Sequence, residues 1–402
     1  MSWFSLARVA LLTASVASCS ERPDRTASGH ASEPPGLTTV TLTGLTTAPA
    51  PWATVPEYTT LAIETLQLGA GESFFARFLA DGSLVVANGS SIVRLGRDGA
   101  LDKVLARQGN GPGEFQVILG LGVADDGSLI ASDHLTGRLT QRSSEGEVVR
   151  TIARLSPITG DGQSLPIAIL PDGRILAVPW QWQAAREPLP GPSGPVTFRD
   201  PVPVVVYDDL GRVSDTVAVL LGLERSSGFV AAFARSALYA ARGGNRWAAG
   251  TSDSIDITVY DGTVPRLRIV APRAGAPVTK LMRARRDSAI TARFGPAVGE
   301  AVVTRQEGAG TPATTPDVGG LLYDAEGRLW IGGYVVPGER ERRWHIFSDR
   351  GVLLGQVLLP ALGDPLLPSR TELLDVGHGR VALARETDDG EVYVEVRRLV
   401  RE

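Results

Sequence analysis

The sequence is poor in the residues that bind metal ions or carry out redox chemistry. Of its 402 residues, one is cysteine and four are histidine. A single cysteine excludes an internal disulfide and any Cys-x-x-Cys metal or redox site. His30 lies near the N-terminus, so only His134, His345 and His378 remain for the rest of the chain. We therefore do not expect a three-histidine metal site.

The common catalytic motifs and a basic charge are also missing. The chain has no His-Glu-x-x-His pair, no Gly-x-Ser-x-Gly nucleophile turn and no phosphate-binding loop ending in Gly-Lys-Ser/Thr. Its formal net charge is −4, whereas proteins that bind nucleic acid are usually basic. We predict no catalytic residues, no bound cofactor, no metal and no nucleic-acid partner.

What the chain does contain is a repeated turn. An Asp-Gly pair or a close relative stands between two apolar runs, which is the short-range signature of a β-hairpin. Copies occur at residues 81–82, 126–127, 172–173 and 326–327, with degenerate copies at 244–245 and 378–379. A second turn follows each of them, at residues 98–99, 145–146, 210–211, 261–262, 350–351 and 389–390.

Two hairpin turns in each of six units predict an all-β fold, a six-bladed β-propeller built from four-stranded antiparallel blades. The alternative is a β-sandwich, in which turns also recur at short intervals. A sandwich does not repeat the same turn chemistry in register along the chain, so we favour the propeller.

The second unit resembles an NHL repeat. It contains Gly-Pro-Gly-Glu-Phe at residues 111–115 and Ser-Asp-His-Leu-Thr-Gly-Arg-Leu at residues 132–139, and it ends at residues 145–150. The chain is thus similar to NHL-repeat and TolB-like six-bladed β-propellers, among them bacterial six-bladed propeller lipoproteins. The match covers residues 74–155 and departs from the family at residues 139–141. It implies the fold more than the function, because propellers host many activities.

The N-terminus predicts an export signal. One positive charge, Arg8, precedes an apolar run at residues 9–16 that is too short for a bilayer, so residues 1–18 are expected to be a signal peptide. Residues 16–19, Val-Ala-Ser-Cys, resemble the bacterial lipobox, which implies that Cys19 is lipidated. We expect a protein of the bacterial cell envelope whose partner is the membrane, through its lipid anchor. Ser20 favours the outer membrane, facing the periplasm or the cell surface.

The rest of the chain divides by composition. Residues 19–50 are rich in Pro, Ser, Thr, Ala and Gly, so we expect a disordered tether. Residues 51–402 are expected to form the propeller. Its last unit shows three clear strands, and we expect residues 59–66 to supply the fourth and close the ring.

Two insertions interrupt the predicted repeat, at about residues 180–201 and 272–316. Apolar residues from Val278 to Phe294 keep helical spacing, so the second insertion is predicted to contain one short helix of about four turns. Its arginines, at positions 283, 285, 286 and 293, are expected on a solvated face, or facing an anionic ligand.

Two groups of residues are candidates for ligand binding. Asp133, His134 and Arg138 follow an apolar strand and could hold a polar ligand at the mouth of the channel, although Asp at such a place usually caps a turn. Trp180 and Trp182 lie on one face of an extended segment and could form an aromatic platform, although packing under a loop is the commoner role.

Three functions fit these features. The first, which we predict, is a monomeric, non-catalytic binding or scaffold module for a protein, peptide or glycan. The second is a metal-dependent hydrolase or lactonase of the gluconolactonase-like propeller type, which holds a divalent cation such as calcium on its axis with Glu, Asn and Asp oxygens. Of the few asparagines that could serve as ligands in such a site, only Asn88 directly follows a predicted blade strand. The third is a structural member of an envelope assembly.

Overall fold

The computed structural model describes most of the chain after residue 35. The described residues are 36–42, 52–60, 74–124, 126–158, 164–179, 197–226, 229–243, 245–271, 275–308, 310–337, 339–361, 372–386 and 392–401. The predicted signal peptide, Cys19, Trp180 and Trp182 lie outside these residues. No helix in the described part of the chain has the length and apolarity of a membrane span.

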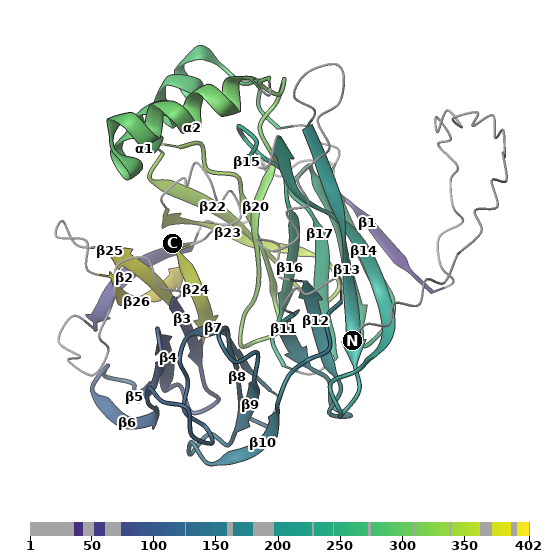
Figure 1. Ribbon diagram of the computed structural model, residues 1–402, viewed down its shortest axis with the longest axis vertical. Helices are drawn as coiled ribbons and strands as arrows, with labels where there is room; N and C mark the ends of the chain where they lie inside the picture. The colour runs from purple at the N-terminus through teal and green to yellow at the C-terminus, as the bar shows by residue number, and fades with distance from the viewer. Residues whose placement is uncertain are drawn as a thin grey trace, which may run out of the picture. The chain divides into compact units, whose positions relative to one another are not determined.

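Two four-stranded antiparallel sheets come first (Figure 1). The first consists of β3 (Phe74–Phe78), β4 (Leu84–Asn88), β5 (Ser91–Leu95) and β6 (Leu101–Ala106). The second consists of β7 (Ile118–Val123), β8 (Leu129–Asp133), β9 (Leu139–Arg142) and β10 (Val148–Ile152). In each sheet the strands pair in chain order, as expected for strands joined by hairpin turns.

Two five-stranded sheets follow. One contains β11 (Ser164–Ile169), β12 (Ile175–Pro179), β13 (Thr197–Tyr207), β14 (Val213–Ser226) and β15 (Phe229–Val230). The other contains β16 (Ala237–Ala241), β17 (Arg246–Thr251), β18 (Ile255–Asp261), β19 (Val264–Ala271) and β1 (Thr38–Thr41). The last five residues of the predicted insertion at 180–201, residues 197–201, therefore belong to β13.

Strand β1 corrects the prediction of a disordered tether at residues 19–50 for residues 38–41; of that range the structure describes only residues 36–42. Its four residues pair in parallel with β19, from Thr38 beside Leu267 to Thr41 beside Val270. Val40 packs partly buried against the core beneath. Three threonines and a valine suit a strand, but the Pro- and Thr-rich surroundings hid this signal. The edge of β19 supplies the partner.

The last sheet has eight strands. In spatial order they are β20 (Val318–Tyr323), β21 (Leu329–Gly333), β22 (Glu341–Phe347), β23 (Leu353–Pro360), β2 (Trp52–Thr59), β26 (Val392–Arg401), β25 (Arg380–Glu386) and β24 (Leu373–Gly377). The prediction of six separate four-stranded blades is therefore wrong in detail: hydrogen bonds define four separate sheets and this larger one. The merger is due to β2, which pairs along β26 and touches β23 at Trp52.

The sheets are arranged like the blades of a propeller. Six strands from these sheets contact one another in a closed cycle, in the order β3, β7, β11, β16, β20, β24 and back to β3. We call these six strands the inner ring. Strand β2 closes the circle by pairing with β26, as an N-terminal strand was predicted to do, but it lies at Trp52–Thr59. Of the residues predicted for this strand, 59–66, those from 61 onward lie outside the described residues.

The predicted turns are confirmed wherever they fall on described residues. At the first, Gly82 has φ +80° and donates to the Leu79 carbonyl at 2.9 Å, while Asp81 Oδ1 accepts from the Ser83 amide at 2.8 Å. Asp supplies the acceptor and Gly the left-handed backbone. The other turn glycines with positive φ are Gly99, Gly127, Gly146, Gly173, Gly211, Gly262, Gly327, Gly351 and Gly379.

The helical insertion contains two helices, not the one predicted. Helix α1 (Lys280–Phe294) matches the prediction and is capped by Thr279, whose hydroxyl accepts from the Met282 amide at 3.1 Å. Helix α2 (Pro296–Gly308) was missed because its apolar residues do not follow a helical period; Pro296 starts it without losing a hydrogen bond. Arg286, predicted to be solvated, is 1% exposed, with its guanidinium over the Phe233 ring and paired with Asp287.

Candidate functional site

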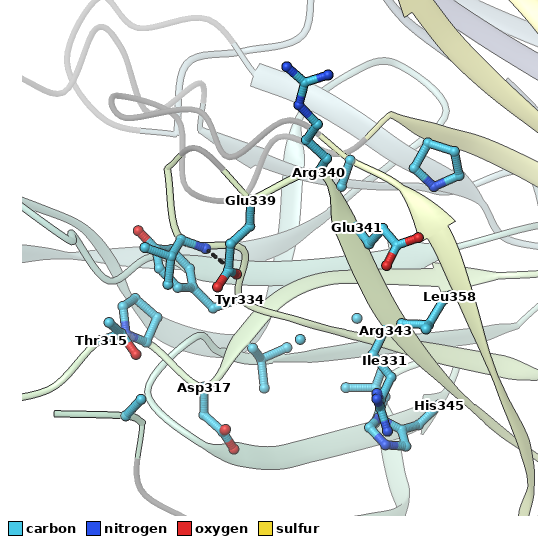
Figure 2. A pocket seen from close by; sticks show the side chains of 18 of the residues that line it. Thr315, Asp317, Ile331, Tyr334, Glu339, Arg340, Glu341, Arg343, His345 and Leu358 are labelled. Atoms are coloured by element: carbon cyan, nitrogen blue, oxygen red, sulfur yellow. Dashed lines mark hydrogen bonds between the residues drawn. The ribbon is translucent and has the colours of Figure 1, made fainter. Parts of the chain in front are cut away.

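A large cavity in the described part of the chain lies where α1 approaches the sheet of β21, β22 and β23. Its volume is about 1170 Å³, slightly above the roughly 300–1,000 Å³ of ordinary small-molecule sites. We call it the helix-side cavity. Its lining comes from α1, residues 315–318, β21, the loop at 334–341, β22, β23 and Arg385 of β25. Figure 2 shows Asp317 and Tyr334 on one side, facing Arg343, His345 and Leu358 on the other.

Strand alternation explains how β22 supplies this wall. In Glu341–Phe347, Arg342, Trp344 and Ile346 are buried on the side of the eight-stranded sheet that faces the last unit. Successive side chains of a strand point to opposite faces. Glu341, Arg343 and His345 therefore line the cavity on the other face. A fixed strand holds these three groups, so little ordering is needed for them to meet a ligand.

Four guanidinium groups line the cavity, and most of their donors have no partner among the described residues. Arg343 donates from Nη1 to Gln356 Oε1 at 3.2 Å, and Arg385 lies 3.4 Å from Glu395. Arg285 and Arg340 are exposed and have no side-chain hydrogen bond to other described residues. Each guanidinium can take a carboxylate side-on through two parallel hydrogen bonds.

Three carboxylates share the cavity with these arginines. Asp317 stands at its inner end, while Glu339 and Glu341 are exposed near its rim. Glu339 Oε2 accepts from the Val336 amide at 3.2 Å, which pins the loop between β21 and β22 (Figure 2). The charged lining is therefore mixed, with four cationic and three anionic groups.

The remaining lining is apolar and contains one aromatic ring. Ile331 and Val318 are buried at its base, and Met282 and Leu358 reach in from α1 and β23. Tyr334 is the only Tyr, Phe or Trp among the lining residues that the structure describes. Sites that bind sugars usually contain several aromatic rings on which the sugar stacks, and this cavity has one. Its apolar base between separated charges instead suits a peptide, which carries both apolar and charged side chains.

The predicted ligand residues Asp133, His134 and Arg138 lie together, and the side chains of Asp133 and Arg138 form hydrogen bonds with the backbone around them. Asp133 is 1% exposed and accepts from the amides of Gln116 and Leu135, both at 3.0 Å. Arg138 donates to the carbonyl of Glu114. The cavity beside Asp133 measures about 20 Å³, room for about one water. This matches the turn-capping alternative; binding of a larger ligand by these residues stays a prediction.

The propeller axis is basic and does not resemble a cation site. A cavity of about 250 Å³ there is lined by the inner ring, and its charged groups are Arg77, Arg242 and Asp375. Burial lowers the pKa of the Arg77 guanidinium, with Asp375 acting in the opposite direction. Asn88 is not among the lining residues. Among described residues, no three His, Cys, Asp or Glu side chains are grouped as metal ligands.

Sequence reasoning missed the helix-side cavity. Its charged residues come from five separate segments of the chain, so no local motif marks it. One signal was present, the dense charge at residues 339–345, Glu-Arg-Glu-Arg-Arg-Trp-His. Such a run is unusual in a strand flanked by apolar partners, and the alternation within it could have identified Arg343 and His345.

Comparisons with known proteins give similar structures but no family. No family model matches the chain, and no curated protein matches it. The resemblance to NHL-repeat and TolB-like proteins therefore stays a prediction.

Three solved structures are similar at low identity. A "putative exported protein" from Bacteroides fragilis is 11% identical, covers 91% of this chain and 99% of its own, and gives a TM-score of 0.46. A gluconolactonase from Xanthomonas campestris is 15% identical, with 88% and 99% covered and a TM-score of 0.38. The calcium-binding protein regucalcin from Agrobacterium tumefaciens is 11% identical, with 88% and 97% covered and a TM-score of 0.40.

Proposed function

We propose that this protein is a non-catalytic binding module of the bacterial envelope, anchored through a lipid on Cys19, which holds an extended peptide segment of a partner protein in the helix-side cavity. The observation that carries the proposal is the cavity itself. It is larger than most metabolite sites, it is lined by charges of both signs, and its floor is apolar.

The partner segment carries an acidic side chain. Arg285, Arg340 and Arg343 are exposed around the cavity and keep donors that other described residues do not use. The carboxylates are fewer, and one oxygen of Glu339 is already taken by the Val336 amide. Charge complementarity of this kind sets the orientation and the choice of partner more than the affinity.

We also propose that the ring has six blades, with the eight-stranded sheet counted as two. Its halves, β20 to β23 and β2 with β24 to β26, are each antiparallel. They are joined by one parallel pair, Trp52 with Val357. The alternative of a lactonase with an axial calcium is disfavoured by the two axial guanidiniums, because a cationic wall repels a divalent cation.

The test is a binding titration on the full chain in detergent. The probes are fluorescent ten-residue synthetic peptides with a common apolar backbone and acidic, neutral or basic side chains. We expect the acidic peptides to bind, with an affinity that falls as salt is raised.

The variant that checks the site is Arg343→Glu, and the matched control is Arg212→Glu, an exposed arginine in the turn between β13 and β14. Arg343→Glu should weaken binding at least tenfold, and Arg212→Glu should leave it unchanged. Equal binding by the two variants, or no preference for acidic peptides, would contradict the proposal.

A further inference from the structure

The axial cavity is a second cavity, separate from the helix-side cavity. All six strands of the inner ring contribute to its wall. Most of that wall is apolar, including Leu119, Leu121, Leu165 and Leu321, and glycines at positions 120 and 122 leave the backbone bare. At about 250 Å³ it is just below the usual size of small-molecule sites.

Two of the three charged groups on the axis satisfy each other. Arg242 donates from Nη1 to Asp375 Oδ1 and from Nη2 to the Phe78 carbonyl at 2.6 Å. Asp375 Oδ2 accepts from the Phe78 amide at 2.6 Å. This pair has a structural role, because it ties the end of β16 and the middle of β24 to Phe78 at the end of β3.

Arg77 is the charge that remains. Its Nη1 donates to the carbonyls of Ala76 and Leu374, each at 2.7 Å. Its Nε and Nη2 have no partner among the described residues. These two atoms form the side-on edge of the guanidinium that fits a carboxylate. The axis therefore carries one positive charge in excess, held among apolar side chains.

We propose that the axial cavity binds the carboxylate of a small organic acid, with its two oxygens on Nε and Nη2 of Arg77 and its carbon chain against the inner-ring leucines. Asp375 offsets only one of the two axial guanidiniums, and one bound carboxylate brings the axis to neutrality. A phosphate is a poorer ligand, because its second negative charge would exceed the single positive charge in excess on the axis. This site is independent of the helix-side cavity and takes a different class of ligand.

The probe is hexanoate, with hexanamide and hexylamine as neutral and cationic controls of the same length. Each is added to the full chain in detergent, and the melting temperature is followed as the concentration rises. A ligand that binds only the folded state raises the melting temperature by mass action. We expect hexanoate to do so, and hexanamide and hexylamine to do so much less.

The variants are Arg77→Gln and, as a control on an exposed arginine of β19, Arg266→Gln. Arg77→Gln should weaken hexanoate binding at least tenfold, and Arg266→Gln should not change it. Equal stabilisation of the unaltered protein by hexanoate and hexanamide would overturn the proposal. This comparison needs no variant, so it remains a test even if Arg77→Gln does not fold. Peptide binding in the helix-side cavity should be the same in all these samples, so the two proposals fail separately.

Discussion

Removal of strand β2 tests how the chain closes its ring. Seven residues of β2 have partners in β26, from Trp52 beside Arg401 to Thr59 beside Glu395. Beyond the strand, the Thr60 hydroxyl accepts from the Val394 amide at 2.8 Å. At about 1 kcal/mol net for each ladder hydrogen bond, the pairing is worth about 7 kcal/mol before the cost of ordering the strand. That is comparable with the roughly 5–15 kcal/mol that stabilises a typical domain.

We therefore expect a chain starting at residue 61 to be unfolded at room temperature. The matched control starts at residue 44, which removes β1 and keeps β2; it should remain folded. Circular dichroism melts of the two truncated chains measure the difference. A synthetic peptide of residues 51–60 should restore the cooperative melt of the shorter chain. If the two truncated chains melt at the same temperature, β2 does not close the ring and this reasoning is refuted.

Three further predictions concern the core, the turns and the anchor. The Trp344 side chain is 1% exposed and packs edge-on against Trp330. Trp344→Ala should lower the free energy of unfolding by about 3–5 kcal/mol, as measured by urea denaturation. A loss near zero would contradict the placement of Trp344 in the core. Hydrogen bonds from Ser128 lower the pKa of Asp126 in the folded protein. The ionised Asp126 therefore stabilises the fold fully at any pH above the pKa of an unfolded Asp, about 3.9. This stabilisation is lost as the pH falls through the lower pKa of the folded state. Asp126→Asn should keep the turn and flatten that acid dependence of the urea midpoint, and an unchanged pH profile would count against it. Cys19→Ser should abolish incorporation of labelled palmitate and release the protein from membranes; continued labelling would rule out this anchor.

Local chemistry is what the sequence predicted well. The turn at Asp81 and Gly82 needs only adjacent residues, a side-chain acceptor and a residue that tolerates positive φ. The period of α1 is likewise readable from its own residues. Such features could be placed from the sequence because no distant partner decides them.

Features that depend on distant partners were missed. Thr38–Thr41 becomes a strand only because the edge of β19 is available to it. Arg286 is buried because Phe233, far away in sequence, lies beneath its guanidinium. The helix-side cavity brings Arg285 and Arg343 to one space from different elements. Pairing between segments remote in sequence is not encoded in any single local pattern.

The most direct test of peptide binding places a reporter inside the helix-side cavity. Cys19 is the only cysteine, so Cys19→Ser gives a full chain into which one labelled cysteine can be introduced. The cysteine of Leu358→Cys would stand in the cavity wall, and that of Val352→Cys in the turn of the same hairpin, outside the cavity. Both positions are accessible to a label, because Leu358 is 48% exposed and Val352 is 58% exposed. Each carries an environment-sensitive fluorophore, and the acidic ten-residue peptide is titrated in. The proposal predicts a saturable shift in emission at position 358 and none at position 352. A shift at neither position, or an equal shift at both, would contradict it.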